Sequence, residues 1–516
     1  MIPVPDPTLC AALAADLAEA SYTAARLRGL WGVAADEAWG RGRTLPARRA
    51  LAGSQAPAAT LARLFCLGEP VSRDDVDAAL PRTRVAGLHA LGLTAQGDDG
   101  LVHPLASVRP QAYVDDQGAG EWWVASDLDE SVLRGPLPED HVLGVGGASM
   151  TLAGLQLPTP AARVLDVGTG CGIQALRARR VADLVVATDI SEGALRFTRM
   201  NALINGISGI DTRAGSLFAP VAGEVFDRIV SNPPFVITPR REGVPAYEYR
   251  DGGLVGDALV EAFVRGAGAH LVEGGTAQLL GNWEYRDGSH GDGLERVRAW
   301  VQASGVPLDA WVIERERLDP IAYAELWIRD GGTVAGSDAY DELLGAWLDD
   351  FAHRGVREVG FGYVLLRRRR PGMPALARYE RVATAVSEGS LGAHLAACLE
   401  AHDRQVVLDD AELAASTLRV SPDVTEARHL VPGAPDPSVI ELRQGGGFGR
   451  TLSVDPALAG VVGACDGDLP LGALIDAVAD LLEVEAGMLR ADLLPRVRGL
   501  IDDGMLELAD AEGAGG

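Results

Sequence analysis

The stretch that decides the fold runs from Val164 to Gly172 and reads VLDVGTGCG. It joins an apolar strand to a glycine-rich turn, and a helical segment follows. The glycines at 168, 170 and 172 allow the backbone to turn tightly and to approach a ligand closely. Asp166 ends the strand, where its carboxylate can accept a hydrogen bond from an amino group of that ligand. The pattern predicts a ligand site at the strand's carboxyl end.

A second acidic residue, Asp189, ends the next apolar strand, LVVATD. At this point of a nucleotide-binding sheet, an acidic side chain accepts hydrogen bonds from ribose hydroxyls. The glycine turn and Asp189 therefore predict a site for a cofactor that contains a nucleoside. Enzymes that use a nicotinamide dinucleotide share both features, so these two motifs alone leave the cofactor open.

The fourth expected strand, FDRIVS, runs directly into Asn232, Pro233, Pro234 and Phe235. The two prolines fix the turn and remove backbone donors. The side-chain oxygen of Asn232 and the carbonyl of Pro233 then offer two acceptors, which match the two protons of a planar NH2 group. Phe235 offers a flat face on which an amide or a base can stack. The motif thus predicts a site that holds a planar nitrogen near an electrophile.

Together these segments resemble class I S-adenosylmethionine-dependent methyltransferases of the N-P-P-[FY] type. That group includes the glutamine methyltransferases of peptide release factors and the amino-methyltransferases of adenine and guanine in DNA and RNA. The resemblance covers residues 140–285, and the segments ATDIS, NALINGI and NPPFVITP are most similar to the release-factor subgroup. It implies S-adenosylmethionine as the cofactor and a nitrogen atom as the methyl acceptor.

The resemblance also implies two sets of site residues. The glycine turn with Asp166 would hold the methionine part of the cofactor, Asp189 the ribose, and Ser216-Leu217 the adenine edge. Ser216 is a departure, because many relatives carry Asp there. The implied catalytic set is Asn232, Pro233, Pro234 and Phe235. The implied cofactor-binding set is Asp166, Gly168, Thr169, Gly170, Gly172, Asp189, Ile190, Ser216, Leu217 and Asn232.

The order of strands and helices around these motifs predicts the fold class. Strand and helix alternate over residues 151–370, which indicates an α/β fold with a doubly wound, mostly parallel, Rossmann-like sheet. We count seven expected strands. The last two bracket a helical insertion over residues 319–356, and we expect them to pair antiparallel at the sheet edge.

Four segments are expected along the chain. Residues 1–110 form a helical, winged-helix-like domain, for which a plain helical packing domain is the alternative. Residues 111–150 form a linker that can also cover the cofactor as a lid. Residues 151–370 form the methyltransferase catalytic domain. Residues 371–516 form an acidic domain, again winged-helix-like.

Composition restricts the partners. The 516 residues carry a formal net charge of −26 and no lysine, which weighs against broad nucleic-acid binding but not against a local arginine patch. The five cysteines lack disulfide or metal-ligand spacing, so no metal is expected. No apolar run of transmembrane length or secretory signal is seen, so we expect no membrane partner and a cytoplasmic location.

Several functions remain open from the sequence. The release-factor-like motifs and the acidic charge favour methylation of a glutamine-type amide in a protein. The winged-helix-like ends and the N-terminal arginines favour the alternative, an adenine or guanine amino group in RNA or DNA. Both make the partner a macromolecular substrate, protein or nucleic acid. A small-molecule acceptor stays open, and the intact motif at Asn232 argues against a non-enzymatic cofactor-binding module.

Overall fold

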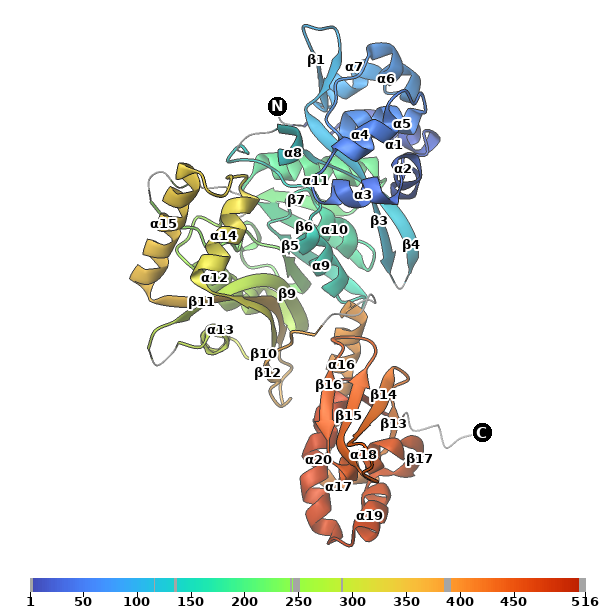
Figure 1. Cartoon of the computed structure of the whole chain (residues 1–516), viewed down its shortest axis with the longest axis vertical. Helices are drawn as coiled ribbons and strands as arrows, with labels where there is room; N and C mark the ends of the chain where they lie inside the picture. Colours follow the sequence, from blue (N-terminus) through green and yellow to red (C-terminus); the bar gives the residue numbers. More distant parts are fainter. Residues whose placement is uncertain are drawn as a thin grey trace. The chain divides into compact units, whose positions relative to one another are not determined.

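The computed structural model describes residues 3–115, 117–133, 137–241, 244, 251–288, 291–384 and 391–509. The chain divides into two compact units (Figure 1). The larger unit contains Met1–Ala153, Pro160–Arg369 and Ala377–Arg381. The smaller unit contains Gly154–Thr159, Arg370–Leu376 and Val382–Gly516. Each unit has its own hydrophobic core, and each is described by itself below.

The larger unit is built on one sheet, which has eight strands among the described residues, in the order β12-β10-β11-β9-β8-β5-β6-β7. Its strands are β5 Ala161–Val167, β6 Ala182–Asp189, β7 Ile210–Ala214, β8 Phe226–Ser231, β9 Leu271–Arg286, β10 Leu308–Leu318, β11 Val356–Arg368 and β12 Ala377–Arg381. The strands from β7 to β9 run parallel, whereas β11 is antiparallel to both β9 and β10. The predicted α/β class with a doubly wound, mostly parallel sheet is confirmed.

The predicted strand count of seven is one too low. The missed strand is β12, which pairs in parallel with β10 at the sheet edge. Its sequence, ARYER, is short and has neither an apolar run nor a buried residue. Such a strand is defined by its pairing partner, so the hydrophobic pattern gave no signal for it.

Helices connect and cover the strands of this sheet. They are α9 Gly147–Leu155, α10 Ile173–Ala178, α11 Glu192–Ile204, α12 Ala258–Ala267, α13 Gly293–Gln302, α14 Pro320–Asp330 and α15 Asp338–Arg354. α14 and α15 form the expected insertion between β10 and β11. None of the helices in the described part of the chain is long and apolar enough to cross a membrane.

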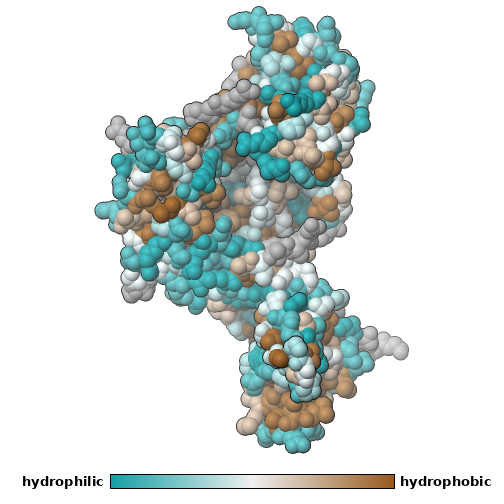
Figure 2. Space-filling model, in the orientation of Figure 1, coloured by the Kyte–Doolittle hydropathy of each residue, from teal (hydrophilic) through white to brown (hydrophobic). Residues whose placement is uncertain are grey.

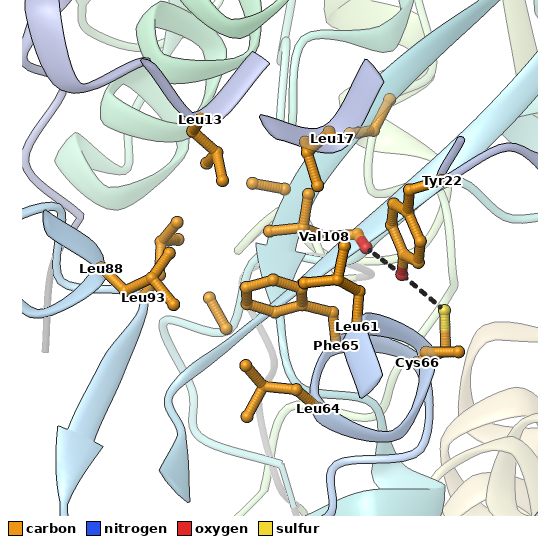
Figure 3. Packing of buried hydrophobic residues seen from close by; sticks show 14 of the residues in the cluster. Leu13, Leu17, Tyr22, Leu61, Leu64, Phe65, Cys66, Leu88, Leu93 and Val108 are labelled. Carbon is orange, nitrogen blue, oxygen red and sulfur yellow. Dashed lines mark hydrogen bonds between the residues drawn. The ribbon is translucent and has the colours of Figure 1, made fainter. Parts of the chain in front are cut away.

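The N-terminal part of the larger unit is mainly helical. Its elements are α1 Pro7–Glu19, α2 Ala24–Trp31, α3 Val33–Gly40, α4 Leu45–Leu51, α5 Pro57–Leu61 with a π-helical turn Ala62–Cys66, α6 Arg73–Ala79, α7 Arg84–Ala90, β1 Thr94–Gln96 and β2 Val102–Pro104. Figure 3 shows its core, where Leu side chains pack with Phe65, and Tyr22 lies at one side of this cluster. The Tyr22 hydroxyl donates to the carbonyl of Val108 (2.9 Å) and lies 3.1 Å from the Cys66 sulfur. The one polar group of this buried ring is thus satisfied.

The linker expected over residues 111–150 is largely a folded structure. β3 (Ala106–Asp115) and β4 (Gly118–Asp127) form an antiparallel hairpin, and the short helix α8 (Glu130–Leu133) follows. Tyr113 and Trp122 stack across the hairpin with ring centroids 4.0 Å apart. Cross-strand aromatic pairs of this kind stabilise hairpins, so this contact helps to hold β3 and β4 together.

One edge of β4 is paired by side chains of α11 instead of by another strand. The Asn201 amide accepts from the Ala125 N–H (2.7 Å) and donates to the Ala125 carbonyl (2.8 Å). One helical turn on, Asn205 makes the same two bonds with Trp123, both 2.9 Å. Asn201 also donates to the carbonyl of Cys171 in the glycine turn (2.7 Å). The side-chain amides of Asn201 and Asn205 thus pair the backbone N–H and carbonyl groups along this edge of β4. Asn201 also joins the edge to the glycine turn.

The smaller unit combines helices with two three-stranded sheets, β17-β13-β18 and β14-β15-β16. Its elements are α16 Leu391–Gln405, α17 Asp410–Ala415, β13 Thr417–Val420, β14 Val424–Leu430, β15 Pro437–Gln444, β16 Thr451–Val454, α18 Pro456–Gly463, β17 Asp466–Pro470, α19 Leu471–Leu482, α20 Ala486–Asp502 and β18 Leu506–Leu508. The helices α18 to α20 and the strand β18 form the last part of this unit. The β14–β16 meander was not anticipated.

The buried amide of Asn201 generates a stability prediction. Replacing Asn201 with Ala leaves the Ala125 N–H and two carbonyls without partners inside the protein, because Asn201 is fully buried. We expect the free energy of unfolding to fall by about 2–3 kcal/mol, measured by urea denaturation with tryptophan fluorescence. Glu192→Ala, on the exposed face of the same helix, is the control and should change it by less than about 0.5 kcal/mol. Equal stability of the two variants would contradict this role.

Candidate active site

A cavity of about 410 Å³ opens at the carboxyl ends of β5, β6 and β8. Most of the residues predicted for the site lie in its wall. They are Gly168, Thr169, Gly170, Asp189, Ile190, Ser216, Leu217, Asn232, Pro233, Pro234 and Phe235. The fold therefore brings together four segments that are separate in the sequence, at the edge where parallel sheets bind ligands.

Two predicted residues, Asp166 and Gly172, lie behind this wall. Asp166 is fully buried and its carboxylate accepts from the Thr169 hydroxyl at 2.7 Å. Gly172 has a φ of +86°, and a Cβ there would lie 3.1 Å from the Thr198 backbone. These positions support the shape of the glycine turn and the packing of α10 on α11.

The glycine turn is held by hydrogen bonds to β6. The Asp189 carboxylate accepts from the Gly170 N–H (3.0 Å) and from the Ser191 N–H (2.9 Å). Burial raises the pKa of Asp189. At the neighbouring strand, the Ser231 hydroxyl donates to the Val167 carbonyl (2.8 Å) and ties the end of β8 to β5. The loop is therefore fixed before any ligand binds.

Asn232 is the polar side chain that stands out in the cavity wall. Its amide nitrogen donates to the Ser149 hydroxyl at 3.3 Å. Its side-chain oxygen is buried and finds no hydrogen-bond donor among the described residues. A buried acceptor without a donor costs about 1–3 kcal/mol, so such atoms are rare in folded proteins. The arrangement leaves this oxygen available to a donor that enters the cavity.

An aromatic wall continues from Phe235 and was missed by the sequence analysis. Trp327, on α14, lines the cavity and meets Phe235 edge-on at 6.4 Å between centroids. Also on α14, the fully buried Tyr323 accepts from the Ile237 N–H (3.0 Å), just beyond the proline turn. The signal was present in PIAYAELWIRD, where two large aromatic residues stand four apart on one helix face. The insertion thus supplies part of the site.

Residues 140–149, before β5, form the other side of the cavity. His141 to Gly144 and Gly146 to Ser149 lie in its wall. Asp127 at the end of β4 anchors the segment, since its carboxylate accepts from the Val142 N–H at 2.8 Å. Burial lowers the pKa of His141, which favours the neutral imidazole there. In contrast, neither Trp122 nor Trp123 lies in the cavity wall. Trp123 instead donates to the Tyr22 carbonyl (2.7 Å) in the packing of the N-terminal part.

Comparison with known families agrees with this geometry. Residues 146–288, which carry the glycine turn, Asp189 and Asn232, match the model of the methyltransferase small domain. This part of the chain is a class I S-adenosylmethionine-dependent methyltransferase domain. The flanking residues 19–104 and 399–508 match two models described as domains of unknown function, DUF7059 and DUF7782.

The methyltransferase domain also has curated relatives. It is similar to a ribosomal RNA small subunit methyltransferase C from Salmonella newport, at 28% identity over 188 residues, 36% of this chain and 48% of that protein. It is similar to a ribosomal protein uL3 glutamine methyltransferase from Bradyrhizobium diazoefficiens, at 35% identity over 166 residues, 29% of this chain and 50% of that protein. The chain spans about half the length of these relatives.

Solved methyltransferase structures cover less than half of the chain. A ribosomal protein L11 methylase from Lactobacillus delbrueckii is 20% identical and covers 44% of this chain and 81% of its own, with a TM-score of 0.26. That score is too low to bear on the function.

The position of Asp189 predicts how the methyltransferase domain binds its cofactor. Asp189→Ala removes the carboxylate expected to accept from ribose hydroxyls and releases the Gly170 N–H. Binding of S-adenosylmethionine should weaken roughly 10- to 100-fold, the equivalent of about 1–3 kcal/mol, measured by isothermal titration calorimetry. Asp183→Ala, exposed near the start of the same strand, should bind like the wild type. Unchanged affinity in Asp189→Ala would remove this residue from the cofactor site.

Asp166 makes the stability of the domain depend on pH. Burial raises its pKa to about 7, well above the usual value for a free carboxyl. Between about pH 4 and pH 7 the folded chain therefore holds a proton that the unfolded chain releases, so stability is lost as the pH rises through this window.

Asp166→Asn keeps the shape and removes the titration. Urea denaturation between pH 4.5 and 7.5 should show the variant gaining stability relative to the wild type as the pH rises. The exposed Asp183→Asn should show no such trend. A difference between Asp166→Asn and the wild type that does not change with pH would contradict the raised pKa.

Proposed function

We propose that the chain transfers a methyl group from S-adenosylmethionine to a planar nitrogen atom of a macromolecule. The observation that carries the proposal is the buried, unpaired side-chain oxygen of Asn232 in the cavity wall. It belongs to a methyltransferase domain and lies beside the glycine turn and Asp189. An amino group with two donors is the chemical complement of such an acceptor.

The cavity fits the proposed cofactor. Its volume of about 410 Å³ lies within the range of small-molecule sites. The glycine turn would hold the methionine part and the Asp189 carboxylate the ribose, and Ile190 with Ser216-Leu217 would hold the adenine. S-adenosylmethionine supplies an electrophilic methyl group on a sulfonium. The segment over residues 140–149 is proposed as the lid on this site.

The chain's own residues would act mainly by positioning. The Asn232 oxygen would accept one proton of the target NH2 group, and this hydrogen bond strengthens as the nitrogen gains positive charge. The ring of Phe235 would stack on the planar group, and Trp327, which meets Phe235 edge-on, would extend this aromatic wall. A strong general base is not needed, since the proton can leave after the nitrogen has become cationic. Fixing the acceptor in this way supplies the orientation that in-line transfer requires.

The acceptor we favour is a glutamine-type amide in a protein. The relative with the higher identity carries the name of a glutamine methyltransferase. The motifs ATDIS, NALINGI and NPPFVITP agree with it, and the net charge of −26 suits a basic protein better than a polyanion.

A second candidate is an amino group of adenine or guanine in RNA or DNA. It is favoured by the surface of α2, α3 and α4, which pack on one another. Between residues 24 and 49 this surface carries more cations than anions: Arg26, Arg28, Arg41, Arg43, Arg48 and Arg49 against Asp36 and Glu37. Only Arg28 and Arg48 of these arginines make ion pairs within the described residues. A local basic surface on an acidic chain is a feature of phosphate binding.

One experiment separates the two acceptors. The full chain is incubated with radiolabelled S-adenosylmethionine and a ribosome-containing cell extract, which is then digested with protease or nuclease. Label released by protease supports the amide, and label released by nuclease supports the base. Failure to label any macromolecule would contradict the proposal.

Asn232→Ala tests the proposed mechanism directly. Loss of one preorganised acceptor should lower single-turnover methyl transfer about 100- to 1,000-fold, with cofactor affinity nearly unchanged. Asn232→Asp should be less damaging, because a carboxylate still accepts. Ser149→Ala is the matched control, since it removes the partner of the amide nitrogen but leaves the oxygen in place. Full activity of Asn232→Ala would make a carbon or oxygen acceptor the better interpretation.

A further inference from the structure

The turn between α19 and α20 in the smaller unit exposes large apolar side chains. We call residues 480–488, sequence DLLEVEAGM, the α19–α20 turn. Within it Leu481 is 82% exposed and Met488 70%, and Leu482 and Val484 are 45% and 46% exposed. Figure 2 shows apolar side chains gathered over α19 at this end of the unit. Single exposed apolar residues are ordinary, but a contiguous group marks a binding surface.

These side chains are not needed by the fold of the unit. The same two helices bury a separate set of residues in its core, among them Leu474, Ile475, Leu493 and Val497. The exposed group therefore lies outside the face that holds α19 and α20 together. Polar residues at these positions would cost the folded chain little, so the apolar group is explained by contact with something else.

Acidic residues are interspersed with the apolar ones. Asp480, Glu483 and Glu485 are exposed, and the α19–α20 turn contains no basic residue. The next arginine, Arg490, is already paired with Asp476, with its Nε 2.8 Å from the carboxylate. Glu485 caps α20, where its carboxylate accepts from the N–H groups of Gly487 and Met488. The surface thus presents apolar contacts together with the negative charges of Asp480 and Glu483, which are not paired within the described residues.

Glu483 adds a conformational argument. It ends α19 in the left-handed region, with a φ of 56° and a ψ of 40°. Glycine is the favoured residue at this position of a helix terminus because it adopts this conformation without steric cost. The Glu483 carboxylate makes no hydrogen bond or ion pair within the described residues. Glu483 therefore adopts an unfavourable backbone conformation, and its carboxylate makes no contact that would stabilise the unit in return.

We infer that the α19–α20 turn binds a basic amphipathic segment of a partner protein. Leu481, Leu482, Val484 and Met488 would contact the apolar face of that segment, and the flexible Met488 side chain suits such a contact. The acidic residues would face its arginines or lysines, which is charge complementarity of the kind that guides protein association. The inference goes beyond the proposed methyl transfer and does not depend on it.

Charge argues against two other occupants. A second copy of this chain, packed through the same surface, would bring the same acidic residues together without a cation between them. An anionic membrane surface would be repelled by the same charges. Both remain outcomes that the experiment detects.

The test is peptide binding by the full chain. The probe is a fluorescein-labelled helical peptide with leucines on one face and arginines on the other, followed by fluorescence anisotropy. Leu481→Ser and Met488→Ser should each weaken binding at least about tenfold, because each removes a large buried apolar contact. Val407→Ser, at a residue 58% exposed elsewhere in the same unit, should bind like the wild type. No binding of the probe, or equal binding by all three variants, would overturn the inference.

Glu483→Gly tests whether the charge at position 483 contributes to binding, because glycine removes the carboxylate and still suits the backbone conformation there. It should weaken peptide binding about two- to fivefold, as expected for one exposed ion pair, while the melting temperature stays the same or rises because the strain is relieved. An analogue of the peptide with glutamates in place of arginines should not bind. Equal binding of that analogue would overturn the charge argument. So would a chain that self-associates in sedimentation through Leu481, or that binds anionic vesicles through it.

Discussion

The larger unit depends on one buried amide, that of Asn201. A strand edge must have its N–H and carbonyl groups paired, and here the edge of β4 is paired by a helix. The same side chain reaches the carbonyl of Cys171 in the glycine turn. A single residue therefore joins the β3–β4 hairpin, the helix α11 and the glycine turn. Water cannot substitute for it, since Asn201 is fully buried.

The walls of the candidate site are connected through the hydrogen bonds of Asn201. α11 begins three residues after Asp189, whose carboxylate holds the glycine turn, and ends at the asparagines that hold β4. At the end of β4, Asp127 accepts from the Val142 N–H and so holds residues 140–149, which line one side of the cavity. The cavity is thus enclosed by elements that are distant in sequence but linked by a few satisfied polar contacts.

The sequence predicted the polar residues of the site better than it predicted the elements that enclose the cavity. The strands β5, β6 and β8 are largely apolar and end at or next to Asp166, Asp189 and Asn232, so these strands and the site at their carboxyl ends followed from local pattern. Their order in the sheet did not. β12, the β3–β4 hairpin and the contribution of Trp327 did not. Each depends on a partner far along the chain: β12 on β10, β4 on α11, and Trp327 on Phe235. The hydrophobic pattern of a short segment does not predict which distant residues it will contact. The segment that contains Asn201 and Asn205 resembles the release-factor subgroup, but only the structure shows that both side chains pair the edge of β4.

The short strand β12 has a consequence for how this protein can be divided. It belongs to the larger unit although the residues on both sides of it, 370–376 and those from 382 onward, belong to the smaller one. A chain cut after residue 370, the expected end of the catalytic domain, would lose the outermost strand and leave residues 310–314 of β10 without their pairing partner. Bare strand edges invite pairing with other chains. No single cut therefore separates the two units, because Gly154–Thr159 and Arg370–Leu376 belong to the smaller unit while Ala377–Arg381 belongs to the larger one.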